Sequence, residues 1–125
     1  MRVANTSASK KKKGKLLEKW VASELRRSGA DPDAQPMPLS GALQFFKGDI
    51  RTRLGYHIEC KNQETWKPKE WLRIAESQRG QSEVPLVIMK SNFEQPVALL
   101  PAADLINLIA ELEGTWETIK KLRQE

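Results

Sequence analysis

An eight-residue stretch near the middle of the chain, YHIECKNQ at 56–63, constrains the fold more than any other segment. Its residues alternate in a way that fits a β-strand, on which successive side chains point to opposite faces. One face of this strand would be apolar and carry Tyr56, Ile58 and Cys60. The other face would carry His57, Glu59 and Lys61. We therefore expect the chain to bury one face, and to present a carboxylate and an ammonium group on the other.

The overall composition limits the classes of function. The chain has 125 residues, enough for one domain with a single core. Lys and Arg number 21 against 16 Asp and Glu, and the net charge of +5 favours a polyanionic partner such as nucleic acid. Cys60 and His57 are the only cysteine and histidine, which excludes an intrachain disulfide and leaves oxygen atoms as the ligands for any metal ion. No apolar run approaches the roughly 18 residues of a membrane span, and no signal peptide is visible, so we expect a cytoplasmic protein without membrane contact.

Apolar residues at helical spacing predict three helical regions. The first runs from about residue 12 to residue 28, and residues 1–12 ahead of it are expected to form a flexible basic arm. The second begins at Pro68 and ends before Gly80. The third occupies residues 101–125, and its apolar stripes would either form a dimer interface or fold back on the sheet. The sequence leaves both arrangements open.

Five segments are expected to form strands. They are residues 42–46, 49–52, 56–61, 84–90 and 96–100. The fourth, VPLVIMK, is continuously apolar, as a central strand covered on both faces would be. Residues 13–100 are therefore expected to form an α/β core, in which helices flank a mixed central sheet.

A three-residue loop that ends in a glycine, RLG, would join the second and third of these strands into a hairpin. In that register Thr52 pairs with Tyr56. Asp49 then stands directly across from Glu59, with Cβ atoms about 4.5–5.5 Å apart. Two carboxylates at this separation repel each other unless a cation or a shared proton lies between them. A two-residue loop would instead move Asp49 to the face of Cys60 and separate the pair.

Paired carboxylates suit Mg²⁺ or Mn²⁺, because these ions prefer oxygen ligands. We expect Asp49 and Glu59 to hold the ion, with the backbone carbonyl of Cys60 as a further ligand. Lys61 lies one step beyond on the same face, and would position the attacking water or stabilise charge that develops on a phosphate. This combination is suited to metal-assisted hydrolysis of a phosphodiester.

Two motifs resemble known nucleases. GDI followed by IECK resembles the PD-(D/E)xK nuclease superfamily, with Asp49 in the first motif. Glu59 and Lys61 form the second motif, and a glycine stands where proline is common. The segment KGKLLEKWVASELRRSG, which starts at Lys13, is similar to the opening helix of archaeal and phage Holliday junction resolvases. It places Glu18 four residues after its first glycine.

This resemblance implies a restriction-endonuclease-like fold and a Mg²⁺- or Mn²⁺-dependent DNA endonuclease in a prokaryotic or phage-infected cell. Selectivity for branched DNA would imply a homodimer, because a four-way junction is resolved by two cuts. Glu18 would help to organise the metal or water, although helical geometry alone allows Glu24 in its place. Gln78 follows Trp71 and Ala75 along one line of the second helix and would lie near the scissile phosphate.

Basic residues near these motifs are expected to bind DNA phosphates. They are Lys10, Lys11, Lys12, Lys13, Lys15, Arg51 and Arg53. Two alternatives remain: a nuclease for linear duplex or single strands from phage recombination or restriction, and a non-catalytic DNA-binding protein. Only a nuclease of this type should require a divalent metal.

Overall fold

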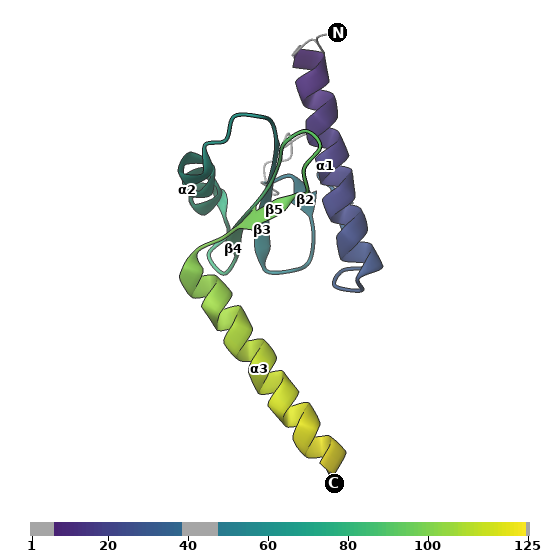
Figure 1. The fold of residues 1–125 in the computed structure, drawn as a ribbon, viewed down its shortest axis with the longest axis vertical. Helices are drawn as coiled ribbons and strands as arrows, with labels where there is room; N and C mark the ends of the chain where they lie inside the picture. Colours follow the sequence, from purple (N-terminus) through teal and green to yellow (C-terminus); the bar gives the residue numbers. More distant parts are fainter. Residues whose placement is uncertain (1–6, 39–47, 125) are drawn as a thin grey trace.

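A three-stranded mixed sheet lies at the centre of the domain in the computed structural model, which describes residues 7–38 and 48–124 (Figure 1). The middle strand is β4 (Val84–Lys90), which pairs in parallel with β3 (Tyr56–Asn62) and antiparallel with β5 (Val97–Leu99). This sheet confirms the α/β class and the central position of the apolar segment 84–90. It also fixes the faces of β3, because Glu59 lies beside Val87, and Lys61 beside Met89.

Two helices cover the opposite faces of this sheet (Figure 1). The helix α1 (Ser7–Arg27) packs on the face of Ile58 and Cys60. The buried residues of this first core are Leu17, Val21, Ala22, Ile50, Ile58 and Cys60. The helix α2 (Pro68–Gln78) packs on the other face, where the buried residues are Trp71, Ala75, Val87 and Met89. The strand β3 therefore buries its apolar face under α1, and directs Glu59 toward the side that α2 covers only in part.

The second expected strand is shorter than predicted and has a different partner. It is β2 (Ile50–Arg51), which pairs antiparallel with β1 (Gln35–Pro36), a segment that is not among the five expected strands. The expected strand at 42–46 lies outside the described residues. The helix α1 begins at Ser7, so residues 7–12 of the expected flexible arm are helical. The helix begins early because residues 8–13 contain no glycine or proline to end it, and lysine is a good helix former.

The C-terminal region is one helix, α3 (Ala102–Gln124), which continues through Gly114 and extends away from the sheet (Figure 1). All residues of α3 are described, and none of them is buried. Of the two arrangements left open by the sequence, the one in which this region folds back on the sheet is therefore wrong. Its apolar side chains remain on the surface because the two sheet faces are already covered by α1 and α2. Within residues 7–38 and 48–124, none of the helices combines the length and the apolar character that a bilayer span requires.

Candidate active site

Asp49 lies at the open edge of β3, on the side away from β4. Its backbone N–H donates to the carbonyl oxygen of Ile58 at 2.8 Å, and its Oδ2 accepts from the backbone N–H of Cys60 at 2.7 Å. The carboxylate thus takes the place of a backbone carbonyl in the ladder that a neighbouring strand would form. Since both hydrogen bonds hold it to the rigid strand, its position is fixed by the backbone of β3.

The predicted hairpin register is wrong, although it led to the correct pair of carboxylates. The strand β2 pairs with β1 and not with β3, and the backbone N–H of Asp49 donates to Ile58, one residue before its predicted partner Glu59. The hydroxyl of Thr52 donates to Oδ2 of buried Asp31 at 2.5 Å. Asp31 also accepts from the backbone N–H of Arg53 at 3.2 Å, which anchors the turn to the end of α1 instead of to β3. The hydrogen bonds of Asp49 consequently reach Ile58 and Cys60 on either side of Glu59 in the sequence.

The Asp49 and Glu59 carboxyl groups are close enough to alter protonation. The pKa of Asp49 is raised to about 7, and burial is the largest cause. The negative charges of Glu59 and Glu18 and a side-chain hydrogen bond with Glu59 also raise it, whereas the hydrogen bond from the Cys60 N–H lowers it. Two buried carboxyl groups at short range therefore disfavour ionisation of one another. The site contains more anionic charge than its own donors neutralise.

Glu18 of α1 is the third acidic residue at this place. Burial raises its pKa, the charge of Lys15 lowers it and the charge of Glu59 raises it. Glu24, which helical geometry alone allowed as an alternative, instead forms an ion pair with Arg27 one turn along the same helix. Of the two glutamates, the structure brings Glu18 to the site, as the resemblance implied.

His57 was not assigned to the site from sequence. It is buried, and its Nε2–H donates to Oε1 of Glu59 at 2.7 Å. Gly48 packs directly against the imidazole: a Cβ atom at this position would lie 3.1 Å from Cε1 of His57. The alternation of the strand placed His57 and Glu59 on one face, and this was the signal that could have revealed the pairing.

Lys61 shares the face of Glu59, as the alternation predicted. Its Nζ lies 5.9 Å from the centre of the Trp71 ring, a distance at which an ammonium group is attracted to the π face of indole. Among the described residues, Lys61 forms no ion pair with Asp49 or Glu59 within 4.0 Å. Trp71 therefore holds the ammonium group beside the acidic pair without neutralising it.

Gln78 does not reach the site. It is exposed at the last residue of α2, whereas Trp71 and Ala75 on the same helix are buried. Because β3 and β4 are parallel, α2 runs from the C-terminal end of β3 back to the N-terminal end of β4. Gln78 thus lies at the end of the sheet opposite Lys61, and its predicted place near the scissile phosphate is wrong.

The oxygen atoms at the edge of β3 fit a hard divalent cation. The backbone N–H and C=O of one strand residue point to the same side, so the carbonyl of Cys60 faces the edge occupied by Asp49. The thiol of Cys60 lies in the first core, where burial raises its pKa. In the described part of the chain, no group of three or more His, Cys, Asp and Glu side chains is placed to hold a metal ion. Mg²⁺ often binds through only one or two carboxylates and completes its shell with water and substrate phosphates, so this donor set fits Mg²⁺.

A comparison with known protein families shows which family the chain belongs to. Residues 9–125 match the model of a family described as "Phage putative PDDEXK endonuclease". The chain belongs to this family. Neither a curated protein nor a solved structure gave a significant match.

The sequence predicts that Asp49 is the first acidic residue of the PD-(D/E)xK motif, and that Glu59 and Lys61 are its second part. The position before Asp49 departs from the usual pattern for a structural reason. Gly48 has φ +98°, a conformation that proline cannot adopt because its ring holds φ near −65°. The missing proline is therefore replaced by a backbone turn that brings Gly48 against His57.

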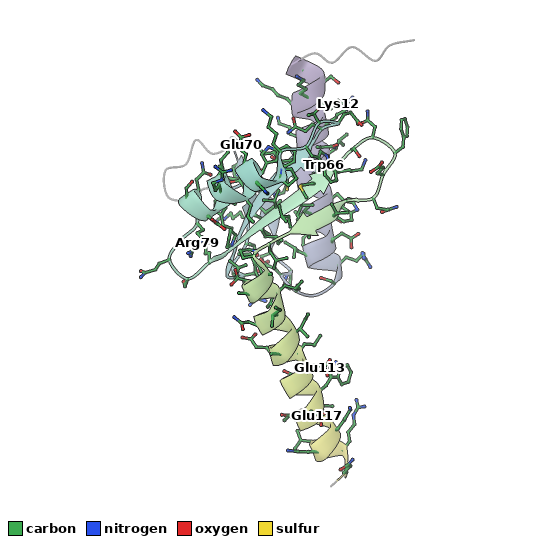
Figure 2. All side chains as sticks on the ribbon, turned by 60° about the vertical axis from the view of Figure 1, so that its left-hand side comes forward. Lys12, Trp66, Glu70, Arg79, Glu113 and Glu117 are labelled. Atoms are coloured by element: carbon green, nitrogen blue, oxygen red, sulfur yellow. The ribbon has the colours of Figure 1, made fainter. Side chains whose placement is uncertain are left out.

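The basic residues expected to bind DNA form two groups in this endonuclease fold. Lys10, Lys11, Lys12 and Lys15 are exposed on the first half of α1, and Figure 2 shows Lys12 pointing away from the helix. The backbone carbonyl of half-buried Lys13 accepts from Nδ2 of Asn62 at 3.0 Å. Because Asn62 is the last residue of β3, this group of lysines lies near the C-terminal end of that strand. Exposed Arg51 and Arg53 lie toward the other end of β3, and Nε of Arg53 is 3.5 Å from Oδ1 of Asp31. The acidic pair lies between the two groups.

Proposed function

We propose that this chain is a divalent-metal-dependent DNA endonuclease whose reaction centre is the edge of β3 at Asp49 and Glu59. One observation carries the proposal: two buried carboxyl groups meet there, and burial, together with the charges of Glu59 and Glu18, raises the pKa of Asp49 to about 7. Such an arrangement destabilises the native state unless a proton or a cation is bound. Family membership supports nuclease activity, and the cation explains why the repulsion is kept.

Asp49, Glu59 and the carbonyl of Cys60 would hold the ion, and Glu18 would bind to it directly or through water. When bound, Mg²⁺ or Mn²⁺ lowers the pKa of a coordinated water and neutralises charge that develops on the phosphate. This role is consistent with the short hydrogen bond from the Cys60 N–H, which orients the Asp49 carboxyl group beside Glu59.

The remaining residues would act on orientation and charge. His57 donates to Oε1 of Glu59 and so fixes the rotamer of that carboxylate, as partners of metal ligands generally do. Lys61, held near Trp71, has no carboxylate partner among the described residues and would approach a bound phosphate or the attacking water. A preorganised cation at this position would stabilise the transition state more than the ground state.

Branched DNA is the substrate that we propose for this activity. The support is the presence of Glu18 at the site, in the helix that resembles the first helix of junction resolvases. The two groups of basic residues on either side of the acidic pair would also suit two helical arms of DNA that diverge from the cleavage point. Linear duplex DNA is the second candidate, because the same groups could follow one continuous backbone.

A cleavage assay with end-labelled DNA tests the proposal. A four-way junction, a duplex and a single strand of matched sequence are incubated with Mg²⁺, Mn²⁺, Ca²⁺ or EDTA, with the Lys61→Ala variant as the control for contaminating nuclease. We expect cuts in the junction near the branch point with Mg²⁺ and Mn²⁺ only. Equal cleavage of duplex would favour the second substrate. Binding without cleavage of any substrate would contradict the proposed nuclease.

A further inference from the structure

Within residues 7–38 and 48–124, no other element packs on α3 closely enough to bury its side chains. It spans 23 residues from Ala102 to Gln124, none of which is buried. Figure 2 shows Glu113 and Glu117 on this helix, well clear of the sheet. Helices gain most of their stability from tertiary packing of an apolar face, and isolated helices are marginal in water. The 23 residues of α3 thus leave several leucines and isoleucines exposed, where a partner surface would stabilise the helix.

The apolar residues of α3 follow a heptad pattern. Apolar side chains separated alternately by four and three residues are Leu105, Ile109, Leu112, Trp116 and Ile119. Four of them are about half exposed: Leu105 45%, Ile109 51%, Leu112 57% and Trp116 46%. Apolar residues at a spacing of 3.5 form the seam of a two-stranded coiled coil, and the pattern here extends over about two heptads. Such a row of apolar residues packs best against another helix whose apolar residues also recur every 3.5 residues.

The charges along α3 indicate the direction of that partner. Asp104, Glu111 and Glu113 make the first part acidic. In the last turns, Lys120, Lys121 and Arg123 outweigh the single charge of Glu117 and make the end basic. A parallel pair of these helices would place like charges side by side. An antiparallel pair places the acidic part of each helix along the basic part of the other, which is favourable at short range.

We propose that α3 pairs antiparallel with α3 of a second copy of this chain. In this arrangement Ile109 packs against the partner's Ile119, and Leu112 packs against the partner's Trp116, around a two-fold axis near Gly114. The flanking Leu108 then lies beside the partner's Leu122, whereas a parallel pair would place Leu108 beside the partner's Glu113. A two-fold axis makes both halves of the interface identical, as in most homodimers.

The base of α3 carries a second complementary feature. A hollow of about 310 Å³ is lined there by Glu76, Glu83 and Asp104, together with Arg79. The guanidinium of Arg79 donates to the backbone carbonyls of Gly80, Gln81 and Glu83, so it is already engaged. The antiparallel pair brings the partner's basic C-terminal turn to this acidic hollow. The interface is separate from the edge of β3 and does not depend on nuclease activity.

The molar mass of the full chain in solution tests the dimer. Sedimentation at 10–100 μM, a range in which weak dimers of about micromolar Kd assemble, should give twice the chain mass of 14.2 kDa. Ile109→Glu should weaken dimerisation at least tenfold, while Ala110→Glu, a neighbouring change on the outer face, should leave it intact. A wild-type chain that stays monomeric throughout this range would overturn the proposal, whether or not the variants fold.

Cysteine substitutions test the antiparallel direction. Thr115 lies near the two-fold axis of the antiparallel pair, so Thr115→Cys should form an intermolecular disulfide under mild oxidation. Leu105→Cys should not, because the two positions lie at opposite ends of the pair. The native Cys60 is buried, and the unsubstituted chain serves as its control. Cross-linking through Leu105→Cys alone would overturn the antiparallel arrangement.

Discussion

Nε2 of His57 lies 2.7 Å from Oε1 of Glu59, and both residues are buried on the face of β3 that carries Lys61. Side chains two residues apart on a strand point the same way, so the backbone itself brings this donor and acceptor together. The bond satisfies one oxygen of a buried carboxylate and selects one orientation for the group. This contact makes His57 a positioning residue for Glu59.

Removal of this donor should affect both stability and rate. His57→Leu should lower the free energy of unfolding by about 1–3 kcal/mol, because a buried acceptor loses its partner. It should also reduce cleavage roughly tenfold to a hundredfold through misorientation of Glu59. His57→Gln keeps an N–H donor and should recover much of both losses. Urea unfolding and single-turnover cleavage measure the two effects, and a fully stable, fully active His57→Leu variant would disprove the positioning role.

Gly48 supports the same pair through its backbone. Its φ of +98° is unfavourable for other residues, and a Cβ atom would lie 3.2 Å from the carbonyl oxygen of Ile58 as well as close to His57. Gly48→Ala should therefore destabilise the protein by about 1–3 kcal/mol. Gly114→Ala in α3, where a Cβ atom meets nothing within 4 Å, should instead be neutral or stabilising by up to about 1 kcal/mol. Thermal melts of both variants compare the two sites, and a neutral Gly48→Ala would contradict the steric argument.

The sequence predicted the parts of the fold that depend on local pattern. The alternation of β3 placed Glu59 and Lys61 on one face, and the helical periodicity around Trp71 located α2 correctly. The turn after β2 could not be predicted from the chain near it. It is controlled by Asp31, which lies 21 residues away and accepts from the hydroxyl of Thr52. A long-range contact of this kind leaves no periodic signal.

For the site as well, local patterns were predicted from the sequence, whereas features that depend on the rest of the fold were not. The hairpin register predicted that Asp49 and Glu59 lie together, and the structure does bring them together, although Asp49 is bonded to Ile58 and Cys60 and not paired with Glu59 in a ladder. Gln78 was wrongly included because the line Trp71 and Ala75 was extended by one turn, beyond the point where α2 leaves the sheet. His57 was passed over because no motif requires it. The hydrogen bond between His57 and Glu59 is buried, and its importance cannot be recognised until the burial of β3 in the fold is known.

Lys61→Ala should abolish cleavage without loss of metal binding. The ammonium group would act on the phosphate or the water and is not a ligand, so its loss should slow the reaction about 10²–10³-fold, by analogy with other preorganised donors. Lys69→Ala, on the exposed surface of α2, is the matched control and should leave the rate unchanged. Cleavage rates and Mn²⁺ binding are measured on the same samples. A rate within threefold of wild type for Lys61→Ala would remove it from the mechanism.

The two groups of basic residues should differ in their contribution to DNA binding. Replacement of Lys10, Lys11, Lys12 and Lys15 by glutamine keeps the helix propensity of α1 but removes four charges. The slope of log K against log salt should fall by up to about 0.9 per lost phosphate contact. Arg51→Gln with Arg53→Gln should change the slope less, because Arg53 is partly engaged with Asp31. An unaltered slope in the lysine variant would show that this half of α1 does not face DNA.

Asp49→Asn provides the sharpest test of the paired carboxylates, because stability and activity should respond in opposite directions. The amide is similar in shape and can still accept from the Cys60 N–H, while its repulsion with Glu59 is removed. In EDTA at pH 8 the variant should melt at the same or a higher temperature than wild type. With Mg²⁺ the order should reverse, because the variant has lost an anionic ligand and most of the stabilisation that metal binding provides. Cleavage should be lost.

The pH dependence follows from the raised pKa of Asp49. The folded value of about 7 lies above the ordinary value of 3.8, so the native state holds a proton that the unfolded state has released. The stability of the metal-free wild type should therefore fall as the pH rises from about 4 to 7, and Mn²⁺ affinity should rise through the same range as metal replaces the proton. Asp49→Asn should reduce both dependences, with a residual effect from Glu18, whose pKa burial also raises. Calorimetric titrations with Mn²⁺ between pH 5 and 8 and melts in EDTA measure this behaviour. If the variant melts far below wild type in EDTA, Asp49 is a structural residue and the paired-carboxylate site does not exist.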